Sequence, residues 1–202
     1  MDRKKTKILI VSESPSAPTG MGEVVRLIFG TLLDRYGGHY DLHQVGLFHA
    51  YSVATPMWPL YPTKGATDKA GTPLFLIADV NGEITFRELL PKIRPDIVFA
   101  FNDTHRVLHL CWPPDDRKHK LILYVNLDGF PFPPHQGPLL NQADLLFTMS
   151  EFSSRVAASI PALRHRKIQN MYSPADITRF KPTTEPEGYV SARPARCHRH
   201  VD

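Results

Sequence analysis

A loop with two glycines is the first feature of the sequence that could do chemistry. Thr19, Gly20, Met21 and Gly22 end the loop that joins the first predicted strand to a helix. Glycines at this place let a ligand approach free backbone N–H groups, and the helix dipole favours an anion there. A tight strand-to-helix connection without a ligand would use the same residues. The loop therefore predicts a site that tolerates phosphate and leaves a purely structural role open.

The spacing of this loop excludes the common nucleotide motifs. A dinucleotide fingerprint needs a shorter loop and a third small residue where Val25 stands, and a P-loop ends in Gly-Lys-Ser/Thr. The chain also lacks the Gly-x-Ser-x-Gly elbow of α/β-hydrolases. It has no Asp-x-Asp, the metal-holding pair of the other large class of sugar transferases.

Polar residues and a glycine follow three further predicted strands: Asn102 and Asp103, Asp128 and Gly129, and Ser150 and Glu151. A carboxylate at a cleft edge can accept a hydrogen bond from a sugar hydroxyl or act as a base. For Asp103 and Asp128 the alternative is a solvated aspartate that caps a turn. The prolines and aromatic residues after Asp128 are expected to hold it in place.

A long loop rich in proline and aromatic residues extends from His49 to Thr72. An irregular loop of this length in a compact domain is usually functional or mobile. Trp58 and Tyr61 within it could stack on the apolar faces of an acceptor sugar, or could pack beneath the loop. The sequence leaves both roles open.

The elements that must position these residues alternate between strand and helix. Strands are predicted at Lys7–Ser12, Tyr40–Phe48, Asp96–Phe101, Lys120–Val125, Asp144–Met149 and Lys167–Met171, and helices at 25–36, 86–93, 135–142 and from Ser150 as N-cap. This alternation predicts an α/β fold, a Rossmann-like doubly wound parallel sheet with right-handed crossovers. Ligands of such sheets bind outside the carboxyl ends of the strands. The candidate residues above are therefore expected to converge on one edge.

Composition narrows the function classes. Of the 202 residues, 42% are apolar and the net charge is +4, which is typical of a soluble globular protein. No apolar run approaches the roughly 20 residues of a membrane span. Basic residues are scattered without interleaved aromatics, which argues against nucleic-acid binding and leaves only a weak peripheral contact with membranes. Two cysteines, Cys111 and Cys197, form no disulfide framework, so a cytoplasmic location is expected.

A metal site is not predicted. His105 and His109 stand four residues apart with Cys111 nearby, but no second ligand cluster accompanies them. The folded domain is expected to cover residues 1–182. Residues 183–202 show no apolar periodicity and are predicted to be a disordered tail.

Four segments together resemble the group 1 (family 4) retaining glycosyltransferases of GT-B fold. They are the strand Lys7–Ser12, the loop Pro18–Gly22, the segment Ala143–Ser153 and the closing Asp176–Pro182. The Asp-apolar-Ser-Glu-Phe and Asp-x-x-Arg-Phe-x-Pro patterns carry most of the likeness. The resemblance covers residues 7–182 and corresponds to the N-terminal, acceptor-side domain.

This resemblance implies hexosyl transfer, with retention, from a nucleotide-diphosphate sugar to a glycan, lipid or small-molecule acceptor, without a required metal or other cofactor. Gly20 and Gly22 would face the donor phosphates and reacting sugar. Asp128 stands where many relatives carry a histidine near that sugar, so the contact with the sugar is assigned to Asp128. Backbone N–H groups at a helix start can stabilise the charge of the departing diphosphate.

Besides Asp128, the sequence departs from the family in two further places. Ser173-Pro174-Ala175-Asp176 replaces the usual Asn-Gly-Val-Asp turn, and nothing after Pro182 resembles the donor-binding domain with its Glu-x7-Glu motif. The chain is therefore expected to be the acceptor-side half of such an enzyme, inactive alone. One alternative is a non-catalytic acceptor-binding subunit that pairs with a separate donor-binding chain. Another is a different Rossmann-like enzyme that uses a nucleotide or sugar phosphate unaided.

Overall fold

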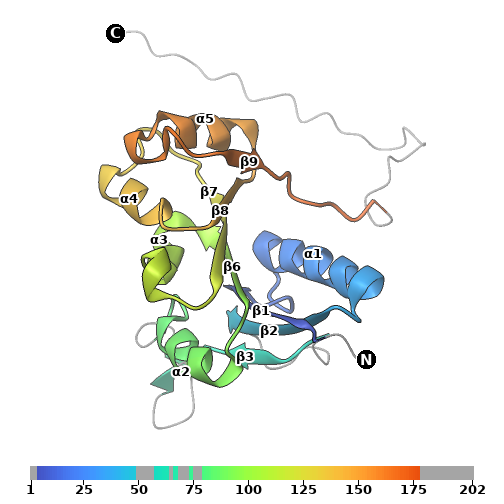
Figure 1. The fold of residues 1–202 in the computed structure, drawn as a ribbon. Helices are drawn as coiled ribbons and strands as arrows, with labels where there is room; N and C mark the ends of the chain where they lie inside the picture. Colours follow the sequence, from blue (N-terminus) through green and yellow to red (C-terminus); the bar gives the residue numbers. More distant parts are fainter. Residues whose placement is uncertain (1–3, 49–56, 64–65, 68–72, 75–78, 178–202) are drawn as a thin grey trace, which may run out of the picture.

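A seven-stranded parallel sheet forms the centre of the protein. The computed structural model describes residues 4–48, 57–63, 66–67, 73–74 and 79–177 (Figure 1). In the sheet the strand order is β3-β2-β1-β6-β7-β8-β9. These strands are β1 (Thr6–Glu13), β2 (Tyr40–Leu47), β3 (Leu60–Pro62), β6 (Ile97–Asp103), β7 (Lys120–Asn126), β8 (Leu145–Thr148) and β9 (Ile168–Asn170), and every neighbouring pair is parallel. Two short strands, β4 (Ala66–Thr67) and β5 (Pro73–Leu74), pair antiparallel apart from it.

The central strands are continuous apolar runs because both faces of the sheet are covered. Along β1, Leu9 and Val11 belong to the core on one face, called the first core. Ile8 and Ile10 belong to the core on the other face, called the second core. Leu9 and Ile10 are fully buried. A strand with water on one side would instead alternate apolar and polar residues.

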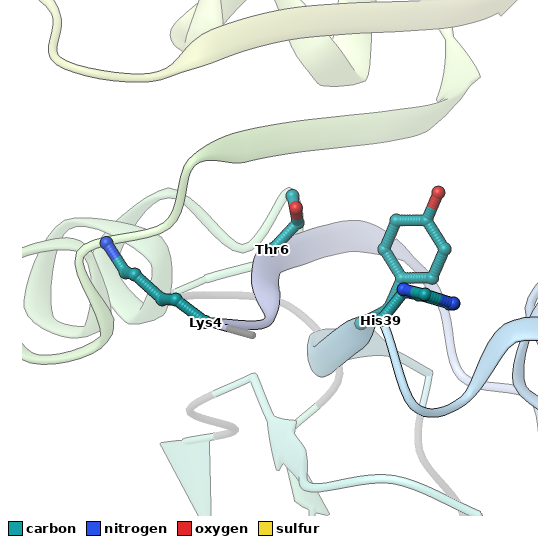
Figure 2. A pocket seen from close by; sticks show the side chains of 4 residues that line it. Lys4, Thr6 and His39 are labelled. Carbon is teal, nitrogen blue, oxygen red and sulfur yellow. The ribbon is translucent and has the colours of Figure 1, made fainter. Parts of the chain in front are cut away.

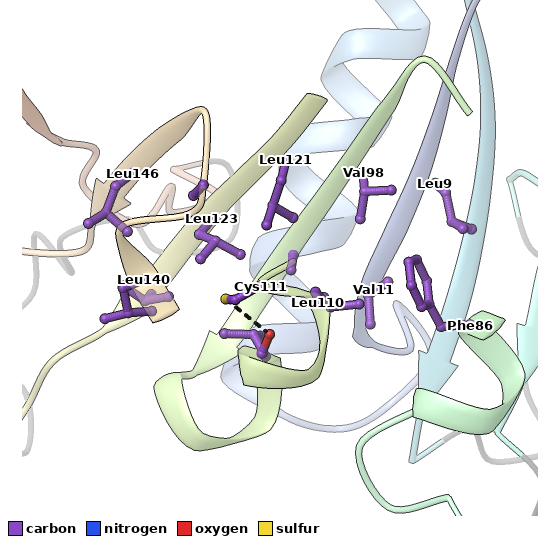
Figure 3. Packing of buried hydrophobic residues seen from close by; sticks show 14 of the residues in the cluster. Leu9, Val11, Phe86, Val98, Leu110, Cys111, Leu121, Leu123, Leu140 and Leu146 are labelled. Atoms are coloured by element: carbon purple, nitrogen blue, oxygen red, sulfur yellow. Dashed lines mark hydrogen bonds between the residues drawn. The ribbon is translucent and has the colours of Figure 1, made fainter. Parts of the chain in front are cut away.

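Helices cover the two faces unequally. On one face lie α2 (Glu83–Ile93), α3 (Thr104–Val107), α4 (Gly137–Leu140) and α5 (Glu151–Ser159), each of which contributes buried residues to the first core. Among the described helices only α1 (Gly20–Tyr36) covers the other face, through Val25 and Phe29, and Trp58 packs there beside it. Figure 1 shows α1 apart from the other helices, and Figure 3 shows the first core against the strands. Short 3-10 helices η1 (Leu108–Leu110), η2 (Pro114–Asp116), η3 (Pro134–Gln136) and η4 (Pro161–Leu163) complete the connections.

The strand order places a topological switch point between β1 and β6. From β1 the chain adds β2 and then β3 on one side, and after β6 it adds β7, β8 and β9 on the other. The connections after β1 and β6 therefore leave the sheet on opposite faces, which opens a crevice outside the carboxyl ends of these two strands. Ligands of open α/β sheets bind at this position.

The predicted fold class is confirmed, and most predicted elements are present within two residues of their expected bounds. The expectation of an irregular loop from His49 to Thr72 was wrong: this range contains β4 and also β3, whose backbone pairs with β2 through Tyr61 and Val45. This strand has three residues and ends in Pro62 at the sheet edge, so its pattern is too short to recognise locally. The predicted tail, residues 183–202, lies outside the described part. Within that part no helix has the length and apolar character of a membrane span.

Candidate functional site

The glycine-containing loop leads into α1 through a side-chain cap. Thr19 has extended backbone angles, and its Oγ1 accepts a hydrogen bond from the Gly22 N–H at 3.1 Å. The same hydroxyl donates to the carboxylate Oε2 of Glu13, the last residue of β1. A negative charge from the protein itself therefore already lies at the start of this helix, where its dipole favours anions.

The two glycines of the loop differ in the reason for having no side chain. A Cβ on Gly22 would lie 2.5 Å from the Ser14 carbonyl oxygen and 2.9 Å from that of Ala17, so the folded loop itself requires glycine. A Cβ on Gly20 would meet no atom of the described residues within 4 Å, and its backbone is not left-handed. Met21 is partly buried against the second core. Of the four predicted loop residues, Gly20 is the one that is open to a ligand without a packing role.

The carboxyl ends of β6 and β7 bring three polar side chains together. Asp103 and Asn126 are direct partners in the parallel register. The Asn126 Nδ2 group donates to Asp128 Oδ2 at 3.4 Å, and Asp128 is exposed beside Gly129. This group of Asp103, Asn126 and Asp128 offers hydrogen-bond acceptors to a hydroxyl-bearing ligand. Asp128 follows β7, which lies two strands from β1 and its glycine loop, about 10 Å at the usual strand spacing.

Asn102 is enclosed at the switch point and does not line an open cleft. Its side chain is 1% exposed, and its Oδ1 accepts a hydrogen bond from the Asp103 N–H at 2.9 Å. Its Nδ2 group has no acceptor within the described ranges. The sequence correctly placed Asn102 at the end of a strand but could not show that its amide is buried.

Ser150 and Glu151 begin α5 and connect it to two other segments. The predicted N-cap is confirmed, because Ser150 Oγ accepts from the Ser153 N–H at 3.1 Å. Ser153 Oγ donates to the Leu127 carbonyl at 3.0 Å. The Tyr172 hydroxyl donates to Glu151 Oε1 at 3.2 Å. Sequence reasoning missed Tyr172, which carries no motif and lies at this edge because it follows β9, the parallel neighbour of β8.

Of the two roles left open for Trp58, packing is the one observed. Trp58 is 4% exposed, and its indole N–H donates to Gln44 Oε1 at 2.9 Å. Its ring makes an edge contact with Phe29 of α1 at a centroid distance of 6.3 Å. Tyr61 lies on β3, at the edge of the sheet, with its ring stacked on His43 and partly buried against the first core. Neither aromatic side chain joins the carboxylates of β6 and β7.

The histidines and the cysteine considered for a metal point in different directions. His105 is exposed, whereas the Cys111 thiol is buried and contacts the Val107 carbonyl oxygen at 3.7 Å (Figure 3). Burial raises the pKa of Cys111 to about 12 and lowers the pKa of His109. Over the described ranges no group of three or more His, Cys, Asp or Glu could hold a metal ion.

A hollow of about 250 Å³ lies at the opposite edge of the sheet (Figure 2). Lys4, Thr6, His39 and Tyr40 line it, at the amino ends of β1 and β2. Because ligands of parallel sheets bind at the carboxyl edge, this hollow is not the candidate site.

Comparison with known proteins adds no assignment. Neither protein-family models nor curated protein sequences gave a match to this chain.

Proposed function

We propose that this chain is the acceptor-side half of a retaining glycosyltransferase, which transfers a hexosyl group from a nucleotide-diphosphate sugar. The observation that carries the proposal is Gly20. This residue lies at the switch point at the start of a 17-residue helix, and packing against the described part of the chain gives no reason for it to be glycine. Close approach of a phosphate or of the reacting sugar to the backbone supplies that reason.

Asp128 is the proposed contact of the reacting sugar. Its exposed carboxylate can accept a hydrogen bond from a sugar hydroxyl, and Asn126 and Asp103 extend the acceptor group toward β6. The separation of about two strand spacings from Gly20 is one that a sugar diphosphate can bridge. As the bond to the diphosphate breaks, backbone N–H groups at the start of α1 would stabilise the charge that develops on the leaving group.

The proposal assigns the nucleotide and most of the diphosphate to a separate donor-binding domain or chain. The transfer reaction requires no metal or other cofactor. The acceptor binds along the carboxyl edge from β7 to β9. We place the reaction in the cytoplasm, because Cys111 is a buried free thiol within a chain that has only two cysteines.

The test is a transfer assay on the chain joined with its donor-binding partner. The full chain is used as bait in a native lysate. The purified chain before the pull-down and the complex recovered after it are each assayed with radiolabelled UDP-, GDP- and ADP-hexoses. We expect no transfer by the chain alone and transfer by the complex. Gly20→Val should abolish it, because the valine side chain would fill the approach to the α1 N–H groups.

Gly38→Val is the matched control. A Cβ at Gly38 also meets no atom of the placed part of the chain within 4 Å, but this residue follows α1 at the opposite edge of the sheet. Its transfer rate should equal that of the unmodified chain. A complex that transfers no hexose, or equal rates for the two valine variants, would refute the proposal.

A non-catalytic acceptor-binding subunit is the second candidate, and the carboxylate of Glu13 favours it. Glu13 accepts the Thr19 hydroxyl at the start of α1, where it would repel a donor phosphate. Glu13→Gln separates the two functions. Measured on the complex with the donor-binding chain, the substitution should strengthen binding of the nucleotide-diphosphate sugar if the chain is part of a transferase. If the chain is a pure acceptor-binding subunit, the substitution should leave the affinity for the nucleotide sugar unchanged.

A further inference from the structure

Three segments that are far apart in the sequence meet at the carboxyl ends of β7, β8 and β9. The loop after β7 contacts α5 through the hydrogen bond from Ser153 Oγ to the Leu127 carbonyl, 3.0 Å long. The segment after β9 crosses back toward β7, where the Tyr124 hydroxyl donates to the Met171 carbonyl at 2.8 Å. Figure 1 shows β7, β8, β9 and α5 next to one another. Residues 126–130, 150–153 and 171–173 therefore form one surface.

Aromatic rings stand out on this surface. Phe130 is 72% exposed, Tyr172 64% and Phe152 45%. The Tyr172 hydroxyl is tied to Glu151 Oε1 at 3.2 Å, which fixes the edge of the ring and leaves much of the side chain in solvent. Phe152 lies between Glu151 and Ser153, the two residues that make the contacts with the other segments.

The charges on the same surface are acidic. Within the three segments the ionic side chains are Asp128 and Glu151. We name Asp128, Phe130, Glu151, Phe152 and Tyr172 together the aromatic–acid cluster. Two carboxylates repel an anionic ligand, such as a phosphate or a lipid headgroup of that charge. They would also lose their hydration beneath a protein partner, whose interface core is depleted of such charges.

A neutral sugar can contact the aromatic rings and the carboxylates at the same time. The C–H face of a pyranose ring is apolar and can lie on an aromatic ring, while its hydroxyls donate to carboxylate oxygens. We infer that the aromatic–acid cluster binds a neutral oligosaccharide and that the acceptor is therefore a glycan. This inference rests on the acceptor-binding part of the proposed function, and it selects a glycan over a lipid or an anionic small molecule.

The experiment titrates the ¹⁵N-labelled full chain with maltotriose, cellotriose and chitotriose at millimolar concentrations, followed by NMR. We expect at least one trisaccharide to shift the amides of residues 126–130, 150–153 and 171–173. Tyr172→Ala and Phe130→Ala should each weaken binding roughly three- to tenfold, the contribution of one aromatic contact. Tyr172→Phe keeps the ring and should bind within about twofold of the unmodified chain.

Tyr36→Ala is the matched control, since Tyr36 is 52% exposed but lies at the end of α1 on the opposite edge. It should leave the affinity unchanged. Absence of shifts with every trisaccharide, or equal affinities for the Tyr172→Ala and Tyr36→Ala variants, would overturn the inference. So would a loss of self-association in the Phe130→Ala variant without loss of sugar binding, because the cluster would then be a protein interface.

The two proposals fail in distinguishable ways. Trisaccharide binding that depends on Tyr172, in a chain whose complex transfers no hexose, would refute the transferase and leave the glycan site in place. If the Tyr172→Ala and Phe130→Ala variants transfer hexose at the rate of the unmodified chain, the glycan site is refuted and the transferase is left in place.

Discussion

The buried ion pair between Arg117 and Asp144 gives the sharpest prediction about stability. The Arg117 side chain is 1% exposed, and its Nη1 group contacts Asp144 Oδ2 at 2.5 Å. The Leu121 N–H donates to the same oxygen at 2.8 Å, and Lys120 Nζ contacts the other oxygen at 3.0 Å. Asp144→Asn keeps the size of the side chain and removes its charge, so Arg117 would be left as a buried cation without its carboxylate.

The magnitude follows from the pKa of Asp144. Desolvation raises this pKa, but the Leu121 N–H, Arg117 and Lys120 outweigh it and lower the pKa from 3.8 to about 2. That difference corresponds to about 2.5 kcal/mol of preference for the charged form. Removal of one partner of a buried pair costs about 3–5 kcal/mol, and Asp144 is 22% exposed, which reduces the effect. We expect Asp144→Asn to lower the free energy of unfolding by about 2–3 kcal/mol at pH 7.

The assay is urea denaturation of the full chain between pH 7 and pH 2. The folded pKa of Asp144 lies below the unfolded value, so its contribution is present above pH 4 and is lost as pH falls toward 2. The difference between the unmodified chain and Asp144→Asn should shrink over this window. Asp115→Asn, at an exposed aspartate of η2, is the control and should change stability by less than about 0.5 kcal/mol. A deficit for Asp144→Asn that stays constant down to pH 2 would refute the reasoning.

Three further predictions concern the loop, a buried histidine and the buried thiol. Gly22→Ala should destabilise the fold by about 1–3 kcal/mol, since its Cβ would lie 2.5 Å from a backbone oxygen. Gly20→Ala should leave the stability unchanged, and equal urea midpoints for the two variants would contradict this difference. Burial and then Arg117 lower the pKa of His119 to about 4, below its unfolded value, so stability should decrease as pH falls from 6.5 to 4. His119→Gln should remove that part of the pH dependence, and an unchanged slope would argue against it. In a Cys197→Ser variant, Cys111 should react with a disulfide reagent at pH 8 only in denaturant, because burial raises its pKa to about 12; rapid labelling of the native chain would show that the thiol is accessible.

Features that depend on neighbours in the sequence could be predicted. The apolar run of β1 indicated a strand buried on both faces, and Ser150 indicated the cap of α5, because both depend on residues within one element. The alternation of strands with helices then restricted the topology to a parallel sheet, since right-handed crossovers leave few other arrangements.

Features that depend on contacts between distant segments were decided only by the tertiary structure. Trp58 is a core residue because Gln44 and Phe29 surround it, and the sequence around Trp58 contains no sign of either contact. The sequence does not distinguish Gly20 from Gly22, yet only Gly22 lies against the Ser14 carbonyl. Tyr172 joins Glu151 because β9 pairs in parallel with β8, so that the residues after the two strands meet at one edge. Local pattern determines which element forms, whereas the approach of separate elements determines which side chains are left for a ligand.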